Sequence, residues 1–148
     1  MAVLTYNNEE YMTFPPILRE YASYLIAIKG NSEKTVCEYL LDLRTFFKYM
    51  KIVFNQEMFP ENGDLSSIVI SDIDIDFIKK IKITDVYEYF DYLTTVRKKF
   101  HNSDIFCEKG LSSAARARKV SSLRSFFKYL QKTGKITENI MAELEFPK

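Results

Sequence analysis

The sequence predicts a single all-α domain, and three observations support this fold class. The chain has 148 residues, of which 47% are hydrophobic, enough for one domain to bury a core without disulfide bonds or metal. Glycine and proline number four each while aromatic residues make up 15%, which disfavours short strands joined by frequent turns. Apolar residues also recur at helical spacing along several stretches.

Two helices are expected in the first third of the chain. Apolar residues recur at helical spacing from Pro16 to Lys29, proline suits a first turn, and a glycine follows, so we expect the first helix there. Asn31 or Ser32 can cap a second helix that reaches Lys51. Its core-facing stripe consists of Val36, Leu40, Leu43, Phe47 and Met50.

An acidic connection is expected over residues 52–82, with a short extended piece where apolar and acidic residues alternate from Ile68 to Ile75. Asp72, Asp74 and Asp76 alternate like calcium ligands, but the glycine and distal glutamate of a calcium loop are missing, so a solvated acidic loop is favoured.

Three further helices are expected in the second half. Thr84 or Asp85 can cap a third helix that ends near the basic cluster at 97–99 and turns Val86, Phe90 and Leu93 to the core. Ser112 can cap a fourth, which carries Val120, Leu123, Phe127 and Leu130 and stops at Gly134. Thr137 can cap a short fifth helix that ends before Pro147.

The net charge of +1 conceals two segments of opposite charge. Residues 55–91 contain nine acids and three lysines, a balance of −6, whereas residues 109–137 contain eight Lys or Arg and no acid, a balance of +8. A basic segment of this kind favours a polyanionic partner, and phosphate neutralisation would make the affinity fall steeply with salt.

A weak internal repeat relates the second and fourth expected helices. A shift of 80 residues aligns 29–50 with 109–130, and nine of these 22 positions are identical, among them the Phe-Phe-Lys-Tyr runs at 46–49 and 126–129. Convergence of two amphipathic helices explains the shared Leu and Phe as well as duplication does. The acids of the first copy, Glu33, Glu38 and Asp42, become Ser113, Arg118 and Ser122 in the second.

Both copies carry a known family pattern. The first reads S-x-x-T-x-x-x-Y-x-x-D-L-x-x-F at Ser32, Thr35, Tyr39, Asp42, Leu43 and Phe46, and the second reads R-K-V-S-S-L-R-S-F-F from Arg118 to Phe127. Over about residues 14–148 the chain resembles the N-terminal core-binding domain of Xer-type tyrosine recombinases and related phage integrases. It departs from the family at Ile140, where proline is usual, at Ala115 and Arg116, and in the length of 52–82.

The resemblance implies a SAM-like bundle of four or five helices, built from two helical hairpins, over residues 14–148, after a tail at 1–13. Such a domain clamps one face of double-stranded DNA, alongside other recombinase protomers, while a catalytic domain, here expected beyond residue 148, closes on the other. The DNA contacts that it implies are Ser32, Lys34, Thr35 and Arg44 on the second helix, and Ser112, Ser113, Arg116, Arg118, Lys119 and Arg124 on the fourth.

Each of these residues has a plainer interpretation. Arginine grips phosphate or guanine through two N–H groups, which favours Arg118 over Lys119 for reading bases, but a solvated helix face is the alternative for both. For Arg124 an ion pair within the protein is equally consistent with the sequence. Lys128, Lys132 and Lys135 are expected to add only to the electrostatic field.

No catalytic residue, metal ligand or cofactor is expected in the chain. A nucleophilic tyrosine would need arginines and a histidine around a phosphate, whereas Tyr39, Tyr49 and Tyr129 fall on or beside core stripes. His101 has no evident partner, and two cysteines, Cys37 and Cys107, do not form a zinc motif. No transmembrane run or signal peptide is evident, so the cytoplasm is the expected location.

A second hypothesis remains open beside DNA binding. A helical protein-interaction or self-association domain would also explain acidic and basic segments, if each met a complementary face on a partner. Salt-sensitive binding of duplex DNA distinguishes the two hypotheses.

Overall fold

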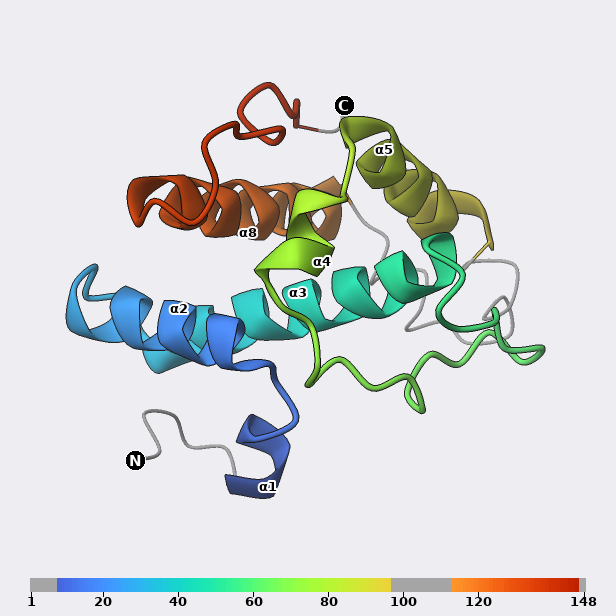
Figure 1. The fold of residues 1–148 in the computed structure, drawn as a ribbon, viewed down its shortest axis with the longest axis horizontal. Helices are drawn as coiled ribbons and strands as arrows, with labels where there is room; N and C mark the ends of the chain where they lie inside the picture. The colour runs from blue at the N-terminus through green and yellow to red at the C-terminus, as the bar shows by residue number, and fades with distance from the viewer. Residues whose placement is uncertain (1–7, 97–112, 147–148) are drawn as a thin grey trace.

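The computed structural model describes residues 8–96 and 113–146, and within these residues the fold is all-α, as predicted. The elements are α1 (Asn8–Tyr11), α2 (Pro16–Ala27), α3 (Glu33–Val53), α4 (Ile75–Lys79), α5 (Ile83–Asp91), the π-helical turn η1 (Tyr92–Val96) and α8 (Ser113–Lys132). The long helix α3 is central and packs against α2, α5 and α8 (Figure 1). The arrangement into two helical hairpins and the domain boundaries at residues 14 and 148 stay predictions.

The ends of α2 and α3 follow the local signals in the sequence. Gly30 has a φ of 68°, the left-handed conformation common just after a helix. The N–H of Asn31 donates to the carbonyl of Leu25 (2.9 Å), which is the six-residue hydrogen bond of a Schellman motif. Ser32 caps α3, since its hydroxyl accepts a hydrogen bond from the backbone N–H of Thr35 (3.2 Å). The two predicted helices are therefore confirmed, each with its end displaced by two residues.

Aromatic side chains join α8 to α2 and α3. Phe126 lies 5.1 Å from Tyr21 of α2 and 6.0 Å from Phe47 of α3, centroid to centroid, both at steep edge-to-face angles. Such pairs add about 0.5–1.5 kcal/mol each beyond the area that they bury. The hydroxyls of Tyr21 and Ser125 are 2.6 Å apart, so the buried phenol has a hydrogen-bond partner. The core thus fixes α8 against both preceding long helices.

The connection between α3 and α4 exposes its acidic residues but packs four apolar residues into the core. Leu65, Ile68, Ile70 and Ile73 are buried, at 2–8% exposure, and successive turns rather than a strand bring them inward. The prediction of an extended piece at 68–75 is wrong. The alternation arises from turns that bury every second or third residue. In addition, the carboxylate of Asp74 accepts from the N–H of Phe77 (3.0 Å) and so starts α4 within this stretch. No strand occurs in the described ranges.

The third predicted helix is confirmed as α5, but the predicted cap at Thr84 or Asp85 is wrong, because the helix begins at Ile83 and Lys82 is its N-cap residue. Its first turn is held by Asp85, whose carboxylate accepts from the N–H of Lys82 (2.9 Å), and it continues into η1. Val86 and Leu93 are fully buried as expected, and Tyr89, at 1% exposure, joins them. The predicted end at 97–99 lies outside the described residues.

The fourth predicted helix is confirmed as α8, which stops before Gly134 at a φ of 79°. The fifth predicted helix is wrong. The chain after Thr137 forms turns, in which the side chain of Asn139 accepts from the N–H of Met141 (3.0 Å) and its carbonyl accepts from the N–H of Ala142 (3.2 Å). Met141 and Leu144 are buried, at 0% and 4% exposure, so this segment closes the core without a helix. No helix of the described residues is long and apolar enough to cross a membrane.

Candidate nucleic-acid interface

Helix α8 carries six Lys or Arg residues and no acid. They are Arg116, Arg118, Lys119, Arg124, Lys128 and Lys132. The structure divides them by what each side chain contacts, and this division determines which of them can meet a polyanion.

A buried carboxylate on α3 holds two of these cations. Asp42, whose side chain is 3% exposed, accepts from Arg118 Nε (2.8 Å) and Nη2 (2.9 Å) and from Lys119 Nζ (2.9 Å). The Lys119 side chain is 9% exposed, whereas that of Arg118 is 40% exposed. Arg118 therefore keeps a surface for a ligand, and Lys119 is chiefly part of the contact between α3 and α8.

A second acid stands beside the same guanidinium. Glu38 Oε2 lies 4.0 Å from Arg118 Nη1, which is beyond hydrogen-bonding distance, and its side chain is 38% exposed. The hydrogen bonds to Asp42 raise the pKa of Arg118, and the negative charges of Asp42 and Glu38 raise it further. The guanidinium is thus always charged.

The two arginines that the repeat aligns each lie over a phenylalanine ring but have different polar partners. Arg44 of α3 lies over the ring of Phe14, 5.5 Å from its centroid, and 3.4 Å from Glu10. Arg124 of α8 lies over the ring of Phe146, also at 5.5 Å, and donates to the carbonyl of Leu144 (3.0 Å). Both arginines hold a flanking segment against the bundle. The contacts of Arg124 are to a backbone carbonyl and a ring rather than to the acid that the ion-pair alternative expected.

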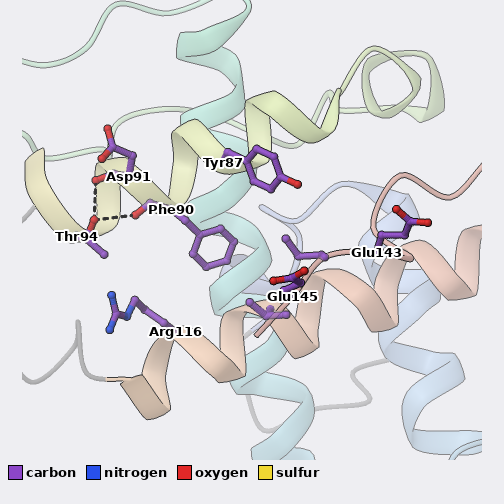
Figure 2. A pocket seen from close by; sticks show the side chains of 9 residues that line it. Tyr87, Phe90, Asp91, Thr94, Arg116, Glu143 and Glu145 are labelled. Carbon is purple, nitrogen blue, oxygen red and sulfur yellow. Dashed lines mark hydrogen bonds between the residues drawn. The ribbon is translucent and has the colours of Figure 1, made fainter. Parts of the chain in front are cut away.

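Arg116 lines a hollow of about 510 Å³ between α5, α8 and the C-terminal segment (Figure 2). Tyr87 and Phe90 of α5 and the carboxylates of Glu143 and Glu145 border the same hollow. Arg116 Nη2 is 3.5 Å from the hydroxyl of Ser113, and its buried Nε has no hydrogen-bond partner in the described part of the chain.

The other proposed contacts lie at helix starts. Ser32 and Lys34 are exposed in the first turn of α3, and Thr35, half-buried, accepts a hydrogen bond from the hydroxyl of Ser32 (3.0 Å). Ser113 is exposed at the start of α8, and Ser112 lies outside the described residues. The contact set as a whole stays a prediction.

Sequence reasoning missed Asp42 as a partner of the cations. The available signal was the contrast between the repeats, because Asp42 aligns with Ser122 and both are buried, at 4% and 1% exposure. A buried acid on one helix facing an acid-free helix requires its counterions from that helix.

Three tyrosines of the long helices occupy packed positions. Burial raises the pKa of Tyr21, Tyr49 and Tyr129, and each of the three rings contacts other aromatic rings. Within the described ranges no group of three or more potential metal ligands is found. His101 and Cys107 lie outside those ranges.

An all-helical fold with a cationic α8 is consistent with the integrase-type N-terminal domain that the sequence resembles. No family model matches the chain, and no solved structure matches it. Among curated proteins, a tyrosine recombinase XerC of Caldanaerobacter subterraneus subsp. tengcongensis is 36% identical over 140 residues, which cover 94% of this chain and 36% of that protein.

Two further relatives match a similar share of the chain. A tyrosine recombinase of Pseudothermotoga lettingae is 29% identical over 89% of this chain and 35% of its own length, and a tyrosine recombinase XerD of Listeria monocytogenes serotype 4b is 26% identical over 89% and 34%. The chain belongs to the Xer-type tyrosine recombinases, as an N-terminal core-binding domain. It spans about a third of the length of these curated relatives.

Proposed function

We propose that this chain binds double-stranded DNA as the N-terminal clamp domain of a tyrosine recombinase that acts in DNA integration or recombination, together with other recombinase protomers. The observation that carries the proposal is α8, a helix of 20 residues with six cations and no acid in a chain whose net charge is only +1. The likeness to tyrosine recombinases supports the same function.

The surroundings of the side chains rank the contacts. Lys34, Arg116 and Arg118 keep exposed or half-exposed charge on the two helices that the family uses, and we assign them the principal phosphate contacts. Ser32, Thr35 and Ser113 lie at helix starts, where small hydroxyl side chains allow phosphate to approach. Lys119 acts through Asp42, and Arg44 and Arg124 contribute charge while they hold flanking segments.

Duplex binding measured by fluorescence anisotropy at two salt concentrations tests this proposal. The contact variant Lys34→Ala/Arg116→Ala should weaken binding about tenfold or more and reduce the slope of log affinity against log salt by roughly two. The control Lys79→Ala/Lys80→Ala removes the same charge from exposed positions at the end of α4 and should change the affinity less than about threefold.

Equal losses in the two variants would reject the contact assignment. A wild-type chain with no salt-dependent affinity for duplex would reject DNA binding itself. Self-association in sedimentation velocity without DNA affinity would instead support a protein-interaction domain.

A further inference from the structure

We propose that Asp42 is a positioning residue that fixes one edge of the Arg118 guanidinium, and that Glu38 competes with a DNA phosphate for the other edge. This inference rests on the proposed DNA-binding function and adds a built-in restraint to it. The site is the contact between the middle of α3 and the first half of α8.

Hydrogen-bond geometry separates the two edges. A guanidinium has five N–H donors, one on Nε and two on each terminal nitrogen. Asp42 accepts from Nε (2.8 Å) and Nη2 (2.9 Å), so it occupies the side edge of Arg118. Both hydrogens of Nη1 and one of Nη2 remain. One hydrogen from each terminal nitrogen forms the end edge, which matches the spacing of two phosphate oxygens.

The buried position of Asp42 makes this orientation rigid. Its side chain is 3% exposed and lies on the central helix, so the carboxylate cannot follow a moving arginine. Holding the side chain of Arg118 in one orientation before DNA arrives lowers the entropy that binding must remove.

The charges around Arg118 determine whether its end edge attracts an anion. Lys119 neutralises Asp42 at 2.9 Å, so the positive charge of Arg118 is left for an outside ligand. Glu38 then balances that charge, and the four side chains together, two cations and two acids, sum to zero.

The contact with Glu38 is weak enough to be displaced. Its carboxylate is 4.0 Å from Nη1, and the two side chains are 38% and 40% exposed. Exposed ion pairs of this kind add little stability, so a phosphate with two oxygens on the end edge displaces Glu38 readily. Glu38 nevertheless lowers DNA affinity by its repulsion of the phosphate.

The first test neutralises the competitor. Glu38→Gln should raise the affinity for duplex DNA about fivefold at low salt, because a like charge next to the phosphate is removed. Glu57→Gln, the same substitution in the exposed loop after α3, is the matched control for net charge and should change the affinity less than about twofold. In an Arg118→Lys background the gain from Glu38→Gln should disappear, because lysine does not present the planar edge.

The second test changes orientation without net charge. Asp42→Asn/Lys119→Met removes one negative and one positive charge, and the amide that replaces the carboxylate offers Arg118 a single acceptor oxygen. Affinity should fall at least about fivefold while circular dichroism shows the wild-type helix content, because an arginine held by one bond no longer presents its end edge in a fixed orientation.

The outcomes separate the inference from the function on which it rests. If wild type binds duplex and Glu38→Gln behaves like Glu57→Gln, or if the charge-balanced variant binds as wild type, the inference is overturned and DNA binding stands. If wild type fails to bind at low salt, the proposed function fails and the inference with it. A gain that is confined to Glu38→Gln and needs Arg118 supports both.

Discussion

Removing the carboxylate of Asp42 should destabilise the protein more than any other single charge change on α3. In Asp42→Asn the ammonium of Lys119, on a side chain 9% exposed, loses the carboxylate that lies 2.9 Å away inside the contact between α3 and α8. Breaking one partner of a buried ion pair costs about 3–5 kcal/mol. Arg118 is 40% exposed and regains water, so the lower end of that range, about 3 kcal/mol, is expected.

Thermal unfolding followed by circular dichroism measures this loss. For a chain of 148 residues, about 3 kcal/mol corresponds to a fall in Tm of roughly 10 °C. Adding Lys119→Met should recover most of the loss, because an apolar side chain of similar length replaces the buried cation that has lost the Asp42 carboxylate. Glu38→Gln, which removes an exposed acid from the same helix, is the control and should change stability by less than about 0.5 kcal/mol.

Either of two results would contradict a loss that originates in the buried Lys119 ammonium. A loss below about 1 kcal/mol in Asp42→Asn would mean that Lys119 reaches water without its partner. A double variant no more stable than Asp42→Asn would mean that the lost free energy does not come from a stranded buried charge.

Three smaller effects are expected. Gly134→Ala should lower the free energy of unfolding by about 1–2 kcal/mol in urea titrations, because a φ of 79° strains any side chain although the space around it is open. Tyr21→Phe should lower it by about 1 kcal/mol through loss of the 2.6 Å bond to Ser125, and an unchanged midpoint would refute this. The hydrogen bond from Lys51 holds the pKa of Asp72 below its ordinary value, so this pair adds stability that is complete above pH about 4 and is lost as pH falls through the lowered pKa. Asp72→Asn should flatten that acid limb of the stability profile.

Local signals predicted the fold class and the long helices. Proline before α2, a serine cap on α3 and glycines after α2 and α8 act within a few residues of where they stand, so spacing alone reveals them. The prediction of a fifth helix was wrong because two local signals compete there: a possible cap at Thr137 and the side-chain turn at Asn139. Only the packing of Met141 decides between them.

The candidate site was predictable in its charge but not in its pairing. The excess of cations on α8 can be counted from the sequence, whereas Asp42 meets Arg118 only because α8 packs across α3, 76 positions away along the chain. Likewise, alternation at 68–75 predicted a short extended piece, because an apolar residue at about every second position is expected in extended backbone and also occurs in linked turns.

The connection between α3 and α4 has a consequence for how this protein opens. Its isoleucines at 68, 70 and 73 are buried, yet its backbone makes only isolated turn bonds, such as Ile68 N–H to Leu65 (3.0 Å) and Ile73 N–H to Ile70 (3.0 Å). Amide hydrogens here should exchange with solvent far sooner than those of α3, while the side chains stay immobile. Deuterium uptake would therefore be fast in this segment although its apolar side chains are buried in the core.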